Sequence, residues 1–274
     1  MPALTAANMN MNMNMNMNMS ALGLPSVAPA QVRFNTADYR KLLLAVTLPP
    51  VVPSYPVNWD PDLKSYVFLE EFLQTNPGWF AALNAPAVIG QTPIAAGVNA
   101  QLLQVLNVAP DREDRFAEII HQHDAEGAIS YFLGMLMIDP SRHPRTYLLI
   151  RVARRIGEHV TMLLKNAHMI QRPSQLCPAV VPMIDPPATP AFPAGHALQA
   201  RLIARCLQTA WAGADRVTLL DYLAHRIGEN RVIAGVHYPR DIDAGVAVAN
   251  ACLPLMQGGA MFQQLMADAT AESQ

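Results

Sequence analysis

Segments with helix-forming composition or apolar residues at helical spacing follow one another through most of this chain, and proline or glycine separates them. Strand signals are few. The predicted helices cover residues 38–47, 63–75, 99–107, 112–136, 145–171, 195–212, 215–234 and 239–256. This pattern predicts an all-α fold, in which helices pack as a bundle around a common core.

The first thirty residues differ in composition from the rest. Asn and Met alternate strictly from Asn8 to Met19, and a stretch rich in proline and alanine follows, ending near Ala30. Since a low-complexity tract has no partner to pack against, we expect residues 1–30 to be a disordered tail and linker. The chain has 274 residues and 51% hydrophobic content, enough to bury a full core. We therefore expect residues 31–274 to form a single helical domain.

Charge and hydropathy restrict the partners of the chain. With a formal net charge of −2, the chain shows no excess of basic residues that would indicate nucleic-acid binding. The apolar run over residues 42–53 is short and broken by proline, and the run over residues 243–256 is also too short to cross a bilayer. The sequence thus predicts no membrane span, and it leaves open whether the chain forms a homo-oligomer.

The beginning of the chain bears on its location. No Lys or Arg precedes Arg33, and asparagine interrupts any apolar core that a secretory signal would need. Residues 27–30 faintly resemble a cleavage site. We expect a cytoplasmic protein, with the periplasm as the alternative.

Three short stretches in the second half of the chain carry chemically informative residues. They are Lys165-x6-Arg172-Pro173, Pro193-Ala194-Gly195-His196 and Arg231-x5-His237-x3-Asp241. Together they supply three side chains that stay cationic near neutral pH and two imidazoles. Each stretch alone also fits an ordinary role, such as a solvated basic face or a turn histidine. Their succession within one domain instead favours a site for a tetrahedral oxyanion.

The residue types suggest which side chain takes which chemical role in such a site. His237 and His196 can share the tasks of a nucleophile or metal ligand and of an acid, because imidazole titrates near neutrality. Asp241, four residues beyond His237, is placed to accept the other ring N–H and to fix the tautomer. No metal site is predicted from the rest of the chain.

Local structure should bring these groups together at helix ends. We expect Lys165 and Arg172 two turns apart on one helix, which Pro173 closes. Gly195 should open a helix, whose unpaired N–H groups favour an anion. The third stretch should join two helices through a turn at His237, with Asp241 in the first turn of the second helix.

The three stretches resemble the signature of the type 2 phosphatidic acid phosphatase superfamily, which includes bacterial class A acid phosphatases, membrane lipid phosphatases and vanadium-dependent haloperoxidases. The family pattern is Lys-x6-Arg-Pro, then Pro-Ser-Gly-His, then Ser-Arg-x5-His-x3-Asp. The resemblance implies an all-α bundle of this type with its active site at converging helix ends. It implies phosphate binding by Lys165, Arg172, Arg231 and the Gly195 N–H, with Ala194 alongside. It makes His196 the general acid, His237 the nucleophile and Asp241 its partner.

Two positions depart from the family pattern. Ala194 stands where the family has the serine before Gly-His, and Asn230 stands where it has the serine before the arginine. The loss of a hydroxyl at position 194 removes a hydrogen bond to the oxyanion, at a cost of roughly 1.5–3 kcal/mol. The cations and both histidines are retained, so we expect a re-tuned site with a narrowed or unusual substrate range.

Two functions from different classes fit these residues. The first is a phosphatase without a cofactor, which hydrolyses a small phosphomonoester or diphosphate ester through a phosphohistidine at His237. The alternative is a haloperoxidase, because vanadate has the shape and charge of phosphate. In that case His237 would ligate vanadium and His196 would assist peroxide in the oxidation of halide. The short distance in sequence between Arg172 and Gly195 favours the phosphatase.

Two other groups of histidines are weaker candidates. His168 lies between Lys165 and Arg172 and is a candidate for the rim of the pocket. His121 and His123 are two residues apart on an expected helix, so they point to different faces and favour a structural role.

Overall fold

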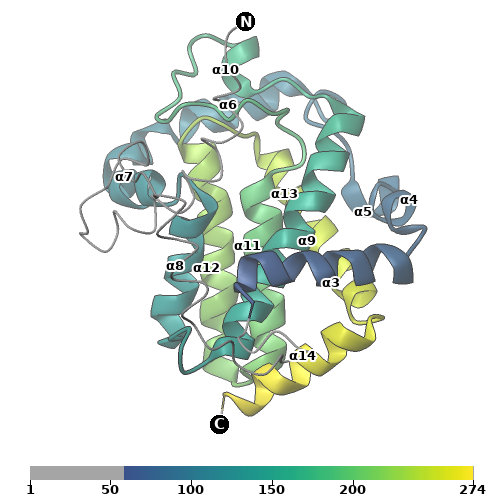
Figure 1. Cartoon of the computed structure of the whole chain (residues 1–274). Coiled ribbons are helices and arrows are strands. Elements are labelled where there is room, and N and C mark those ends of the chain that lie inside the picture. The colour runs from purple at the N-terminus through teal and green to yellow at the C-terminus, as the bar shows by residue number, and fades with distance from the viewer. Residues whose placement is uncertain (1–58, 274) are drawn as a thin grey trace, which may run out of the picture. The chain divides into compact units, whose positions relative to one another are not determined.

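The structure, a computed structural model, describes residues 59–273 of the chain. Every regular element in this part of the chain is a helix, which confirms the predicted all-α class (Figure 1). The elements are α3 (Pro61–Thr75), α4 (Trp79–Leu83), α5 (Pro86–Ile89), α6 (Val98–Asn107), the 3₁₀ helix η2 (Ala109–Asp111), α7 (Arg112–His121), α8 (Ala125–Leu136), α9 (Pro144–His168), α10 (Pro173–Leu176), α11 (Gly195–Ala210), α12 (Ala214–Ile233), α13 (Pro239–Met256) and α14 (Ala260–Ala271). The predicted tail at residues 1–30 and the predicted helix at residues 38–47 lie outside the described residues.

Most predicted helices agree with the structure to within about three residues at each end. The prediction of one helix over residues 112–136 is wrong, because a turn at Gln122–Asp124 divides it into α7 and α8. The Asp124 carboxylate accepts a hydrogen bond from the Gly127 N–H at 2.7 Å and so caps the new helix. The sequence analysis also missed α14, which follows Gly258 and Gly259.

Helix α11 occupies the centre of the bundle and packs against α9, α12 and α13 (Figure 1). Helix α3 packs across α9, and α14 packs against α9 and α11. Helices α7 and α8 cover α12, while α4, α5 and α6 contact α13. The N-terminus of α11 is therefore surrounded by other helices.

Apolar side chains at helical spacing form the core between these helices. Leu149 and Ile156, two turns apart on α9, are almost completely buried, as are Leu198 and Leu202, one turn apart on α11. Val248 of α13 completes this group. Residues separated by four or seven positions lie on one face of a helix, so the sequence pattern directs these faces inward.

A glycine lets α13 pass close to the first turn of α11. A Cβ atom added to Gly245 would lie 2.7 Å from the Ala194 carbonyl oxygen and 3.1 Å from the Leu198 nitrogen. One turn earlier on α13, the Asp241 carbonyl accepts a hydrogen bond from the Ala194 N–H at 2.9 Å. The absence of a side chain at position 245 thus brings Asp241 against the start of α11.

We predict that Gly245→Ala destabilises the protein by about 1–3 kcal/mol, because the added methyl group forces α11 and α13 apart. Urea unfolding measures this change. Gly134→Ala is the matched control. Gly134 is also inside a helix but has open space around it, so this substitution should stabilise by up to about 1 kcal/mol. Equal effects of the two substitutions would contradict the close approach.

Candidate active site

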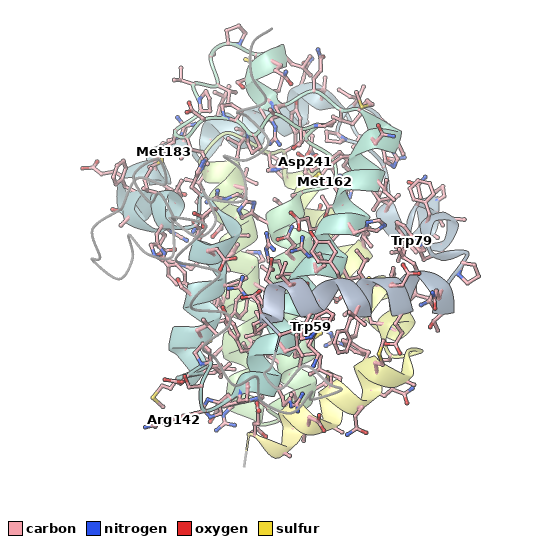
Figure 2. The ribbon with its side chains drawn as sticks, viewed as in Figure 1. Trp59, Trp79, Arg142, Met162, Met183 and Asp241 are labelled. Atoms are coloured by element: carbon pink, nitrogen blue, oxygen red, sulfur yellow. The ribbon has the colours of Figure 1, made fainter. Side chains whose placement is uncertain are left out.

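The three sequence stretches meet at one place, where α9 and α12 end and α11 and α13 begin. Asp241 lies inside the molecule in this region, beneath the ribbon (Figure 2). Lys165, Arg172, His196 and Arg231 all lie close enough to His237 to act on its charge. The predicted convergence of helix ends is therefore present in the structure.

Arg172 reaches the site by a different route from the one expected. Helix α9 ends at His168, and Met169 takes a left-handed conformation with φ of 52°. Arg172 is extended, and Pro173 begins α10 instead of closing α9. The expectation that Lys165 and Arg172 share one helix face is wrong, because the chain turns between them.

Main-chain carbonyl groups hold both of these cations. Lys165 Nζ donates hydrogen bonds to the Pro190 and Ala191 carbonyls, the second at 3.0 Å. Arg172 donates to the Val236 carbonyl at 2.8 Å and to the Thr189 carbonyl at 2.9 Å. A carbonyl carries no net charge, so these contacts orient the cations without neutralising them. Sequence reasoning missed this segment, because its role depends on where the chain folds back.

Burial changes the acidity of the cations. Lys165 is 3% exposed, and desolvation together with the Arg172 charge lowers its pKa to about 7. Desolvation likewise lowers the pKa of Arg172 to about 10, against the opposing charge of Asp241. Lys165 is thus the cation whose charge changes near neutral pH.

His237 and Asp241 form a buried pair. His237 Nδ1 lies 2.9 Å from Asp241 Oδ2, and the same oxygen accepts a hydrogen bond from the Tyr238 N–H at 2.9 Å. Because a carboxylate accepts, Nδ1 carries the proton and Nε2 presents its lone pair. Nε2 lies 3.3 Å from Arg172 NH1. Burial, followed by the charge of Lys165, lowers the pKa of His237 well below its ordinary value. The His237 ring is therefore neutral, with Nε2 unprotonated.

His196 lies in the first turn of α11, next to the N-terminus of that helix. Its Nε2 atom is buried and has no hydrogen-bond partner among the described residues. Burial, and then the charge of Arg231, lowers the pKa of His196 to about 3. The nearby Gln122 main chain acts in the opposite direction and raises this pKa. Gly195 precedes it, and a Cβ there would approach the Thr161 methyl group to 3.3 Å.

Arg231 lies in the last turn of α12 and is 2% exposed. Its NH2 group donates to the Ile119 carbonyl at 3.2 Å, while its Nε has no partner among residues 59–273. Burial lowers the pKa of Arg231 to about 10, so it stays charged at neutral pH. Its free N–H is available to an anion in the site.

The two departures from the family pattern have different structural consequences. Ala194 is the residue before α11 and is fully buried. Because alanine has no polar side-chain atom, the first turn of α11 has no side-chain cap. Asn230 points away from the pocket toward α7, where it donates to Gln122 Oε1 at 2.8 Å and to Glu118 Oε2 at 3.1 Å. Asn230 therefore joins a different network from the one that a phosphate-binding serine would join.

The weaker histidine candidates take structural positions. His168 Nε2 lies 2.7 Å from Asn84 Oδ1, and its ring packs edge-on against Phe192 at 5.1 Å. These contacts hold the His168 ring between Asn84 and Phe192, and Phe192 lies four residues before His196. His121 packs against Tyr131 at 5.4 Å. Within residues 59–273, no three His, Cys, Asp or Glu side chains gather in a way that could hold a metal ion.

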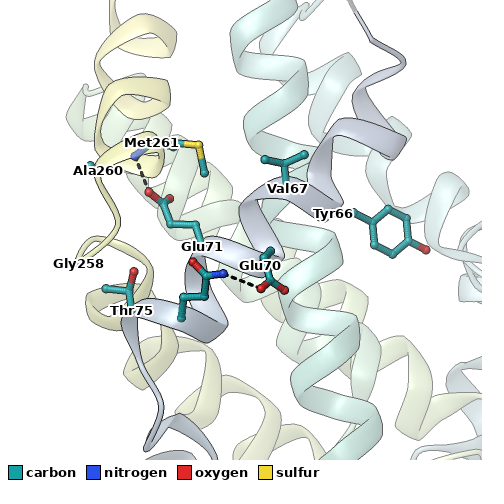
Figure 3. Close-up of a pocket in the computed structure, with 9 residues that line it drawn as sticks. Tyr66, Val67, Glu70, Glu71, Thr75, Gly258, Ala260 and Met261 are labelled. Carbon is teal, nitrogen blue, oxygen red and sulfur yellow. Dashed lines mark hydrogen bonds between the residues drawn. The ribbon is translucent and has the colours of Figure 1, made fainter.

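Two hollows help to locate the entrance of the site. One of about 540 Å³ lies beside Arg172, between the end of α9 and residues 186–190. A second of about 810 Å³ lies between α3 and α14, where Glu71 accepts a hydrogen bond from the Met261 N–H at 2.6 Å (Figure 3). None of the groups that surround His237 lines the second hollow. The hollow beside Arg172 is the one that adjoins the site.

Comparison with known proteins supports the predicted enzyme class. Over 128 residues the chain is 28% identical to decaprenylphosphoryl-5-phosphoribose phosphatase from Mycobacterium tuberculosis, in strains CDC 1551 / Oshkosh and H37Rv alike. The match covers 46% of this chain and 69% of the relative. No family model matches the chain. The relatives are phosphatases, and the prediction of an enzyme that hydrolyses phosphoric ester bonds is confirmed.

One of the solved structures resembles part of the chain. It is a transmembrane type 2 phosphatidic acid phosphatase from Bacillus subtilis that acts on phosphatidylglycerolphosphate, with a TM-score of 0.36 and 16% identity. The match covers 72% of this chain and 94% of that structure. In residues 59–273, no single helix has the length and apolar character to cross a membrane, but α13 and α14, bent by 101°, have them as a pair. Because this helix pair has the length and composition of a span, the expectations of no membrane span and of a cytoplasmic location no longer stand.

We predict that sulfate binding weakens as the pH rises above about 7. Sulfate stays a dianion across this range, while Lys165, whose pKa is lowered to about 7, loses its charge. The dissociation constant should rise by up to about tenfold per pH unit between pH 7 and pH 9, as measured by calorimetry. Lys165→Met should bind more weakly and show a flatter slope. Equal slopes for the two proteins would show that another group titrates.

Proposed function

We propose that this protein hydrolyses a phosphomonoester or diphosphate ester through a phosphohistidine at His237, without a cofactor. The supporting observation is the His237 Nε2 lone pair, which the Asp241 carboxylate orients and which three cations surround. An unprotonated imidazole among fixed positive charges suits attack on a phosphoryl group, whose negative charge the cations stabilise.

The first chemical step forms a bond between His237 Nε2 and phosphorus and breaks the bond between phosphorus and the leaving oxygen. His196 donates a proton to that oxygen. Lys165, Arg172 and Arg231 bind the three remaining phosphoryl oxygens. Asp241 stabilises the positive charge that develops on the His237 ring.

The second step consumes one water molecule. His196, now neutral, accepts a proton from the water, whose oxygen attacks phosphorus. The bond between phosphorus and Nε2 breaks, and inorganic phosphate leaves. Both histidines return to their starting protonation states, so the cycle balances.

His196 must be protonated for the first step, although burial lowers its pKa to about 3. Bound substrate raises the pKa of His196 again, because a phosphate dianion beside the ring favours the charged imidazolium. The proton therefore enters the site with the substrate. This coupling limits acid catalysis to the occupied site.

The curated relatives support the substrate class. Their name states that they act on decaprenylphosphoryl-5-phosphoribose, and they are phosphatases. We propose a phosphate ester substrate for this chain as well, with the hollow beside Arg172 as the place for its leaving group.

We predict that His237→Ala abolishes the release of phosphate from p-nitrophenyl phosphate while circular dichroism shows an unchanged fold. Assays in buffer with a chelator should leave the wild-type rate unaltered. Acid-labile phosphate should be trapped on the wild-type protein and not on the variant. Bromination after vanadate loading, in the absence of phosphatase activity, would instead support a haloperoxidase. An unaltered rate in His237→Ala would overturn the role of His237.

We predict that Ala194→Ser tightens the binding of phosphate by about tenfold, because the added hydroxyl can donate to the oxyanion. The same hydroxyl can cap α11, so the melting temperature should also rise. Inhibition constants for phosphate and a thermal melt measure the two effects. A rise in melting temperature alone would show that the hydroxyl serves the helix and not the anion.

A further inference from the structure

Thr189, which lies outside the three sequence stretches, holds two nitrogens of the Arg172 guanidinium group. The Thr189 carbonyl accepts a hydrogen bond from Nε at 2.9 Å, and the Thr189 hydroxyl accepts one from NH2 at 3.1 Å. Nε also donates to the Pro187 carbonyl at 3.1 Å. Because the guanidinium group is planar, acceptors on two of its nitrogens fix the orientation of its plane.

The other N–H groups of Arg172 have acceptors at unequal distances. NH1 donates to the Val236 carbonyl at 2.8 Å and lies 3.3 Å from His237 Nε2. The second contact of NH2 is with the Pro190 carbonyl at 3.5 Å. An N–H···O hydrogen bond is ordinarily about 2.7–3.2 Å long, so the contacts to His237 and Pro190 are the weak ones. One N–H of NH1 and one of NH2 are thus the donors that an oxyanion can take over.

These two donors make a fork that suits a phosphoryl group. NH1 and NH2 are attached to the same guanidinium carbon, and a pair of N–H groups in this arrangement matches two oxygens of a phosphate. NH1 is also the group beside His237 Nε2, the atom to which phosphorus would bond. A rotation of the guanidinium plane would move the fork away from that atom. The orientation of the plane therefore matters for the site.

The segment that carries Thr189 is held in place by its own chain. The Thr189 N–H donates to the Pro187 carbonyl at 2.7 Å, and the Ala191 N–H donates to the Ile170 carbonyl at 2.8 Å. Three of the six residues 186–191 are proline, which restricts φ. Thr189 is half-buried and lines the hollow beside the site. Its hydroxyl is thus presented from a stiff support.

We propose that Thr189 is a positioning residue for Arg172. Its carbonyl holds Nε and its hydroxyl holds one N–H of NH2, so that the remaining fork faces the phosphoryl oxygens beside His237. In this role Thr189 acts through Arg172 and does not touch the substrate. The inference rests on the proposed phosphatase function and adds a residue that the family signature does not contain.

The test measures sulfate binding to the full-length chain by calorimetry, because a dissociation constant needs no turnover. Thr189→Val removes the hydroxyl but keeps the shape of the side chain and the main-chain carbonyl. The dissociation constant should rise by about tenfold, since a hydrogen bond that orients a charged group is lost. Thr189→Ser keeps the hydroxyl and should stay within about twofold of wild type. For p-nitrophenyl phosphate, kcat/KM should fall in Thr189→Val by about the same factor.

A second background separates positioning from general support of the fold. Lysine has no NH2 group for the hydroxyl to hold. In Arg172→Lys, the further change Thr189→Val should therefore alter the dissociation constant by no more than about twofold.

The pH dependence of binding gives an independent readout. Lys165 is held by the carbonyls of Pro190 and Ala191, which Thr189→Val leaves in place. Wild type and Thr189→Val should therefore lose affinity for sulfate above about pH 7 with the same slope. A general displacement of the segment would change the slope as well as the affinity.

Ser174→Ala is the matched control. Ser174 lines the same hollow, but its hydroxyl is not among the acceptors of Arg172 in residues 59–273. Loss of this hydroxyl should leave the dissociation constant of sulfate within about twofold of the wild-type value. Thermal melts of all variants show whether each one folds.

The outcomes separate this inference from the proposed function. Unchanged sulfate binding in Thr189→Val would overturn the positioning role, and so would an equal loss of affinity in the Arg172→Lys background. Weak binding by Thr189→Ser, or failure of Thr189→Val to fold, would assign the residue to packing and overturn the role as well. If wild type and variants bind sulfate as expected but wild type hydrolyses no phosphate ester, the proposed phosphatase function fails while Thr189 still positions Arg172 for an anion.

Discussion

Uncompensated positive charge, buried at converging helix ends, is the constraint on which this site depends. Three cations share the region with a single carboxylate, Asp241, and both imidazoles are neutral. Buried charges of one sign repel one another and lose hydration, which is costly unless polar groups orient them. The carbonyls of residues 187, 189, 190, 191 and 236 do so for Lys165 and Arg172. A multiply charged anion completes the charge balance, and this is the physical basis of the proposed function.

The fold serves this arrangement through close helix packing. Helix α11 begins inside the bundle, and Gly245 lets α13 approach so closely that the Asp241 main chain bonds to Ala194. The carboxylate that orients His237 and the helix that carries His196 are thereby fixed to each other. The packing of α11 against α13 therefore also sets the positions of the two histidines that we propose to be catalytic.

The two residues that depart from the family pattern change the site in different ways. At position 194, alanine removes a donor and leaves α11 without a cap. At position 230, asparagine is long enough to reach Glu118 on α7 and Gln122 in the turn that follows it, which a serine hydroxyl is not. One change weakens contact with the anion, and the other ties the end of α7 to the site. The three cations and both histidines are retained, which is why we propose a re-tuned site.

The sequence by itself determined the helical class, most helix boundaries, and the identity of the charged and titratable groups, because periodicity, proline and motif spacing are local properties. It also indicated the turn at His237 and the helix start at Gly195. Only the tertiary structure decided that Arg172 enters from a loop, that His168 binds Asn84, and that Asn230 binds Gln122. Those contacts join residues far apart in the chain. They depend on how helices pack, which no local pattern encodes.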